Sequence, residues 1–207
     1  EIPAGEPIEK RSPIPTSVSS TVKLYHEEYF ARAPRLTMVF PAVEQFTKDA
    51  YALDYLGQLL SGGKKTPMYK ILVKDKKLTS GVGAYNMALE LAGIFQISVT
   101  ANPGVNLTEV EKAIFESFDL FEKEGFTEED LEALKARNET GFYNNFSSIL
   151  SKSFTLGQYQ MFKDDPSFYA DDFAGQQAVT AEDIKNVIQK YIKGKNFVMT
   201  SFVPRGE

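Results

Sequence analysis

The fold of this chain is decided by residues 56–101, which read LGQLLSGGKKTPMYKILVKDKKLTSGVGAYNMALELAGIFQISVTA. The stretch predicts a helix that ends at Gly62-Gly63, where one glycine would supply the left-handed residue that stops a helix. A short second helix is expected around residues 68–72, because Met68, Tyr69, Ile71 and Leu72 share one face. Two strands follow, at residues 79–86 and 93–101. The order helix, Gly-Gly, helix, strand, strand is the most specific pattern in the sequence.

The second of these strands carries a clear alternation of side chains: Phe95, Ile97 and Val99 against Gln96, Ser98 and Thr100. A period of two places the apolar set on one face of a sheet. We expect this face to be buried against the preceding helix, for which Thr47 is a suitable N-cap.

The N-terminal residues differ in character from the rest of the chain. Prolines at positions 3, 7, 13 and 15 oppose a helix and favour extended chain, so residues 1–18 are predicted to be a Pro-rich interdomain linker. Residues 19–207 then form one domain. Because the sequence opens at Glu1 without a methionine or signal peptide, we expect it to be either a mature protein or a piece of a longer one, and the family resemblance described below favours the piece.

Further elements flank the central stretch. Strands are expected at residues 21–28, 35–40 and 197–203. Helices are expected to begin at the N-caps Asn106, Thr127 and Thr180. The helix from Thr127 is expected to place these apolar residues on one side: Leu131, Leu134, Phe142, Phe146 and Ile149. Residues 151–175 are expected to form two shorter helices. This order indicates an α+β fold with a largely antiparallel sheet of about five or six strands and helices on one face.

Composition excludes several classes of protein. The chain has 207 residues, of which 43% are hydrophobic and 25% charged, as in ordinary globular proteins. No apolar run approaches the roughly 20 residues of a membrane helix. The net charge of -5 and the lack of a basic stripe disfavour a nucleic-acid partner. There is no cysteine, which excludes disulfides, thiolate metal sites and cysteine nucleophiles.

The residues that usually carry catalysis are scarce. His26 is the only histidine, and Phe30 stands where an H-E-x-x-H motif needs its second histidine. The carboxylate pairs are predicted to lie at turns or at element ends rather than in apolar surroundings: Glu27-Glu28, Glu128-Glu129, Asp164-Asp165 and Asp171-Asp172. We therefore predict no catalytic residue and no metal ligand in this chain.

Several segments together resemble the insulinase/pitrilysin family of zinc peptidases, which includes mitochondrial processing peptidase. Members carry a helix ending in L-G-G-G, then a segment L-R-E-x-x-G-L-A-Y, then G-x-F-x-I. The matching segments in this sequence are Leu60-Ser61-Gly62-Gly63, Met68-Tyr69, Leu78 with Val82, Gly93–Ile97, Phe126–Leu131 and Val179–Ile184.

The resemblance implies the fold of that family and a second, non-catalytic domain, because the inverted zinc motif H-x-x-E-H is absent. Such a domain would form part of the wall of a peptide-enclosing chamber. Its partners would be a preceding zinc-bearing domain, a second homologous half or subunit, and an unstructured peptide. Zinc is expected only in the full-length zinc metalloendopeptidase, and no activity is expected of this chain alone. Related bacterial proteins are often exported, which favours the periplasm.

Two positions match a substrate-holding Arg and Tyr of the family without conserving them. They are Val73 and Ser80, which would be weak substrate-contact positions. The Arg/Tyr pair would then come from the other half. Two alternatives stay open: a structural or interaction subunit of the same fold without peptidase activity, and a small-ligand module that uses the aromatic residues of segment 142–173.

Overall fold

One five-stranded sheet organises the part of the chain that the computed structural model describes, residue 5 and residues 9–205. The strand order is β1-β5-β2-β4-β3. The strands are β1 (Val22–Glu28), β2 (Arg35–Ala42), β3 (Thr79–Ala88), β4 (Gly93–Ala101) and β5 (Val198–Pro204). The β1–β5 pair is parallel and the other three pairs are antiparallel, so the sheet is mixed. The predicted α+β class with a largely antiparallel sheet is confirmed.

The centre of the sheet is buried on the face that the alternation predicted. On β4, Phe95, Ile97 and Val99 are each 0% exposed. Their partners on β2 are Phe40, Met38 and Leu36, which are equally inaccessible to solvent. Residues directly opposite each other in antiparallel strands share a face, so these six side chains form one apolar layer.

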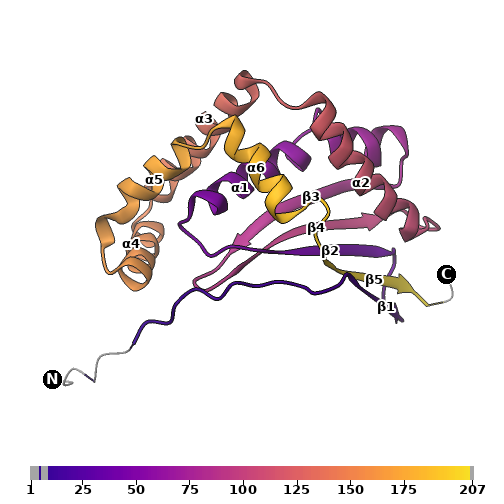
Figure 1. The fold of residues 1–207 in the computed structure, drawn as a ribbon, viewed down its shortest axis with the longest axis horizontal. Helices are drawn as coiled ribbons and strands as arrows, with labels where there is room; N and C mark the ends of the chain where they lie inside the picture. The colour runs from indigo at the N-terminus through magenta and orange to yellow at the C-terminus, as the bar shows by residue number, and fades with distance from the viewer. Residues whose placement is uncertain (1–4, 6–8, 206–207) are drawn as a thin grey trace.

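Three helices cover this layer, as Figure 1 shows: α1 (Lys48–Ser61), α2 (Leu107–Glu124) and α6 (Ala181–Tyr191). Each of these helices begins at its predicted N-cap: Thr47, Asn106 or Thr180. The Thr47 side chain accepts a hydrogen bond from the Ala50 amide, and Thr180 forms a capping box with Asp183. No helix covers the opposite face of the sheet among the residues described.

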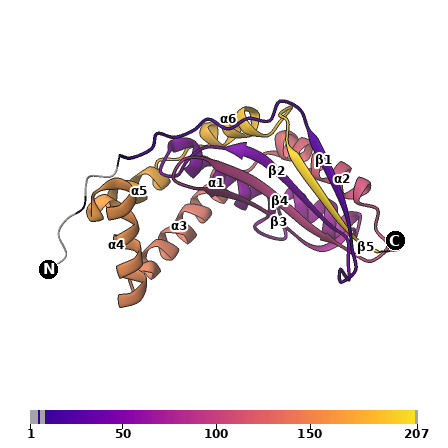
Figure 2. The ribbon, with the colours of Figure 1, turned by 90° about the horizontal axis from the view of Figure 1, so that it is seen from below.

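The remaining helices project beyond one end of the sheet as an arm in both views (Figures 1 and 2). The arm consists of α3 (Glu128–Asn145), α4 (Ile149–Lys163), a short 3₁₀ turn (Pro166–Phe168) and α5 (Tyr169–Gln177). The expected single helix reaching Ile149 is wrong. The Ser148 side chain accepts a hydrogen bond from the Ser151 amide and starts a new helix there, which leaves Ile149 88% exposed.

Two glycines of α1 and its C-cap stand where a larger side chain would clash. The prediction of a left-handed residue at Gly62-Gly63 is wrong, because Gly62 has φ -75° and Gly63 is not among the residues with positive φ. Gly62 is needed for space instead, since an added Cβ would lie 2.5 Å from the Gln58 carbonyl oxygen. At Gly57 an added Cβ would lie 2.7 Å from the Ala84 carbonyl oxygen, so glycine allows α1 to pack directly on β3. The expected short second helix is a π-helix, Tyr69–Asp75.

The described part of the Pro-rich segment, residues 9–18, contains neither helix nor strand. The Ile14 amide donates a hydrogen bond to the Leu91 carbonyl oxygen at 2.8 Å, so the segment touches the β3–β4 hairpin. The interdomain role of residues 1–18 stays a prediction, and residues 1–4 and 6–8 lie outside the described part. Among the helices described, none is long and apolar enough to cross a membrane.

Candidate functional site

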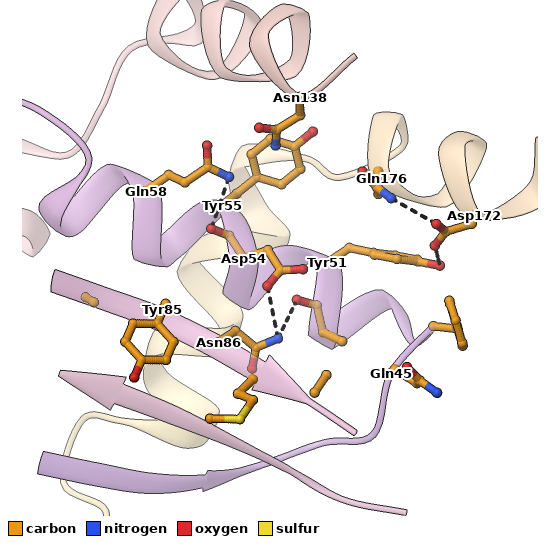
Figure 3. Close-up of a pocket in the computed structure, with 15 residues that line it drawn as sticks. Gln45, Tyr51, Asp54, Tyr55, Gln58, Tyr85, Asn86, Asn138, Asp172 and Gln176 are labelled. Atoms are coloured by element: carbon orange, nitrogen blue, oxygen red, sulfur yellow. Dashed lines mark hydrogen bonds between the residues drawn. The ribbon is translucent and has the colours of Figure 1, made fainter. Parts of the chain in front are cut away.

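A pocket of about 610 Å³ opens between α1, the edge strand β3 and the arm helices α3 and α5 (Figure 3). Asp54, Tyr55 and Gln58 of α1 line one side, and Asn138 of α3 lies above them. Residues 84–88 of β3 line the opposite side. Because β3 is an edge strand, the pocket lies at one edge of the sheet.

The position of Asp54 follows from helix periodicity. Ala50, Asp54, Gly57 and Ser61 recur every three or four residues, so one face of α1 presents them all to β3. The Asn86 side-chain amide donates to the Ala50 carbonyl oxygen and to Asp54 Oδ1, both at 3.2 Å. These contacts hold the Asp54 carboxyl group at the edge of β3.

The pocket changes the acidity of Asp54. Burial by the surrounding walls raises the pKa of this carboxyl group to about 7; the Asn86 amide partly offsets the rise, and the Asp172 carboxylate adds to it. Asp54 is nonetheless an exposed residue at the mouth of the pocket, so solvent reaches its carboxyl group and moderates the effect of burial. Its charge can therefore respond both to pH and to a ligand.

A second carboxylate, Asp172 of α5, lies deeper and is only 7% exposed. It accepts hydrogen bonds from the Tyr51 hydroxyl at 2.6 Å, the Tyr159 hydroxyl at 2.7 Å and the Gln176 amide at 3.1 Å. Burial and the neighbouring carboxylate raise the pKa of both phenols. The expectation that no carboxylate pair is buried is wrong for Asp172, because packing of α5 on α1 encloses it.

Two polar atoms of the pocket lining are buried without a hydrogen-bond partner among the described residues: the Tyr55 hydroxyl and Asn86 Oδ1. Burial raises the pKa of the Tyr55 phenol, and the Asn138 amide above it in Figure 3 partly offsets the rise, although the contact falls short of hydrogen-bond geometry. A buried polar group without a partner is unfavourable, so such atoms indicate places where a bound group would gain hydrogen bonds.

The two positions singled out in the sequence do not line this pocket. Val73 is half-buried on the π-helix, and Ser80 is exposed at the beginning of β3, before the segment 84–88 that the pocket uses. Their role in substrate contact stays a prediction. His26 is exposed on β1. Within residues 5 and 9–205, no group of three or more His, Cys, Asp or Glu side chains could hold a metal ion.

Sequence reasoning missed Asp54. A signal existed, because Asp54 interrupts the buried run of α1 between Leu53 and Tyr55. An acidic residue at the boundary of an apolar helix face is common, however, and its pocket depends on α3 and α5, which lie far away in sequence.

Comparison with known families decides what kind of domain this is. The model of the peptidase M16 inactive domain matches residues 1–138. The chain belongs to the peptidase M16 inactive-domain family. The resemblance to insulinase/pitrilysin zinc peptidases is thereby confirmed, and so is the interpretation as an inactive domain of zinc protease-like proteins.

Individual relatives agree with this family. The chain is similar to the zinc protease PqqE of Helicobacter pylori, with 32% identity over 101 residues, 49% of this chain and 23% of the relative. An M16 inactive domain from Pseudomonas fluorescens has the same fold, with a TM-score of 0.74, 21% identity, and coverage of 98% of this chain and 46% of the other. The periplasmic protease PqqL of Escherichia coli matches with a TM-score of 0.69, 13% identity, and coverage of 91% and 21%. The M16 inactive domain described here thus spans less than half the length of these relatives.

Proposed function

We propose that this M16 inactive domain forms part of the wall of a peptide-enclosing chamber and supports a zinc-bearing domain elsewhere in the full-length chain. The observation that carries the proposal is the family match over residues 1–138, in a chain that spans only 23% of a zinc protease relative. Residues 1–18 would connect the two domains. The partners would be the preceding zinc domain, a second homologous half or subunit, and an unstructured peptide.

The edge strand β3 supports contact with a peptide. The Ala84 amide donates to Ser61 Oγ at 2.8 Å, so the main-chain groups of Ala84 point away from β4. Main-chain direction alternates along a strand, and we infer that the amide and carbonyl groups of Asn86 and Ala88 face the pocket as well. An extended peptide can add to such an edge through main-chain hydrogen bonds.

Zinc chemistry would belong to the other domain, where a bound metal ion would activate water for peptide hydrolysis. The compartment is proposed to be the periplasm, which the description of PqqL as a periplasmic protease supports.

The full-length protein tests the proposed function. We expect it to hold stoichiometric zinc and to cleave unstructured peptides, and we expect deletion of residues 19–207 to abolish cleavage. The chain on its own is expected to retain no zinc after dialysis and to cleave nothing. Zinc content by metal analysis and peptide turnover measure these outcomes. Tightly held zinc in the isolated chain would contradict the proposal, and a full-length protein without zinc or turnover would favour the structural or interaction subunit.

A double substitution tests on which side of the chamber the domain lies. Val73→Arg with Ser80→Tyr would place the two hydrogen-bond donors of the family at positions where this chain lacks them. We expect no gain of turnover in the full-length protein, because the Arg/Tyr pair is proposed to come from the other half. A large rise in the rate of peptide cleavage would overturn this placement.

A further inference from the structure

The pocket beside β3 carries negative charge without a balancing cation in its lining. Two of the lining residues are acidic, Asp54 and Asp172, and none is lysine, arginine or histidine. Asp172 already accepts hydrogen bonds from three donors, whereas the Asn86 amide is the one side-chain donor that contacts the Asp54 carboxylate among the described residues. A carboxylate can accept about four hydrogen bonds, so Asp54 retains free acceptor capacity at the pocket mouth.

The unpartnered atoms of the pocket point to the same type of ligand. The Tyr55 side chain is 1% exposed and its hydroxyl group lacks a partner, as does Asn86 Oδ1. The Asn86 oxygen can only accept a hydrogen bond, and the Tyr55 hydroxyl can accept one. The half-buried Asn138 side chain lies next to that hydroxyl (Figure 3). The Asp54 carboxylate and the Asn86 oxygen can therefore only accept further hydrogen bonds, and the Tyr55 hydroxyl can both accept and donate, so the site fits a ligand that carries several N–H donors.

Two cations that contact residues of the pocket lining are held by other groups. Arg137 of α3 donates to the side-chain oxygen of Gln58, and the Lys163 ammonium of α4 lies 5.1 Å from the ring centre of Phe46 and 4.9 Å from that of Phe168. The facing segment of β3, residues 84–88, contains no charged residue. The aromatic rings of the lining suit the aliphatic stem that carries an ammonium or guanidinium group.

We propose that this pocket binds a cationic nitrogen group, ammonium or guanidinium, of an extended peptide lying along β3, with Asp54 as its counter-ion. The inference rests on the proposed function, because it names the class of peptide that the chamber wall prefers. A peptide is favoured over a free amine because the pocket adjoins the β3 edge, where the main chain of Asn86 and Ala88 faces outward.

The charge of Asp54 gives the site a pH dependence with a definite sign. Because its pKa is raised to about 7, the carboxyl group is mostly neutral well below pH 7 and ionised above it. A cationic ligand needs the ionised form, so its preference is expected to weaken as the pH falls from about 8 to about 6. The charged groups facing Asp54 from the packed elements are Asp172 and, at the rim, Arg137; Asp172 disfavours ionisation of Asp54.

The test uses the full-length protein, with zinc removed by a chelator so that peptides are bound but not cleaved. The probes are fluorescent peptides of one sequence, blocked at both ends, with lysine, arginine or norleucine at a single position. One further norleucine peptide has a free N-terminus. Native protein is expected to bind the lysine and arginine peptides about tenfold more tightly than the blocked norleucine peptide at about pH 8, the range of one charge-assisted hydrogen bond.

Asp54→Asn preserves the shape of the side chain and removes its charge. We expect this variant to bind the lysine, arginine and norleucine peptides about equally. The matched control is Asp171→Asn, an exposed carboxylate of α5 outside the pocket, which is expected to keep the preference. Thermal melts check that both variants fold. Preference for the free N-terminus alone would assign the cation to the peptide terminus rather than to a side chain.

Equal binding of all four peptides by native protein, no binding of any of them, or a preference that survives Asp54→Asn would overturn the inference. Hydrolysis by the zinc-loaded protein is measured separately with the norleucine peptide. Cleavage without a cation preference would remove only this inference, whereas loss of zinc and of all cleavage would remove the proposed function.

Discussion

Replacing Ile97 with alanine is expected to lower the free energy of unfolding by about 2–5 kcal/mol. Ile97 lies at the centre of β4, between Met38 of β2 and Ala84 of β3, and is 0% exposed. Helices close the layer above it, so the structure cannot collapse freely into the space that the side chain leaves. Denaturant melts of the variant and the native domain measure the difference.

The control is the next residue along the strand. Ser98 faces the side of the sheet that helices leave open and accepts a hydrogen bond from Arg35 at 3.2 Å. Ser98→Ala is expected to change the free energy of unfolding by less than about 1 kcal/mol, as is usual for surface positions. Similar losses for both substitutions would mean that β4 does not have one buried face.

Removing the Asp172 carboxylate is expected to have a comparable effect. Asp172→Ala leaves the buried hydroxyls of Tyr51 and Tyr159 without their acceptor, and each unsatisfied buried donor costs about 1–3 kcal/mol. We expect a total loss of about 2–6 kcal/mol in denaturant melts. The exposed neighbour Asp171 provides the control, because Asp171→Ala is expected to change little. A loss no larger than that of the control would mean that water replaces the carboxylate.

The same cluster predicts how stability depends on alkaline pH. The pKa values of Tyr51 and Tyr159 are raised in the folded state, first by burial and then by Asp172. The folded protein thus holds these protons more tightly than the unfolded chain, whose tyrosines ionise near pH 10. Their contribution to stability is complete below about pH 10 and is lost as the pH rises above it. Replacing both tyrosines with phenylalanine is expected to flatten that decline.

The central layer could be predicted from the sequence because strand alternation and helix caps depend only on residues close together in the chain. The alternation along residues 93–101 fixes which side chains of β4 share a face, and burial of Phe95, Ile97 and Val99 follows from it. Thr47, Thr127 and Thr180 each cap a helix where predicted, since a cap needs only the backbone amides of the next turn. The family could be identified from the central stretch together with residues 126–131 and 179–184, and Gly57 of that stretch allows α1 to approach β3.

Local patterns were less informative in the arm. The spacing of apolar residues predicted one helix through Phe142, Phe146 and Ile149, but the Ser148 hydroxyl caps a new helix that begins at Ile149. The parallel pairing of β1 with β5 also escaped prediction, because it joins residues about as far apart in sequence as this chain allows. Pairing at that distance is decided by the assembled sheet rather than by neighbouring residues.

The candidate site belongs wholly to the tertiary structure. Asp54, Asn86, Asn138 and Asp172 come from four different elements, and no spacing in the sequence relates them. The raised pKa of Asp54 and the unpartnered atoms of the pocket arise only when the arm packs on α1 beside the edge strand β3. The sequence determines the type of each side chain. The pKa of that side chain and its free hydrogen-bonding capacity depend on the burial and the neighbours that folding supplies.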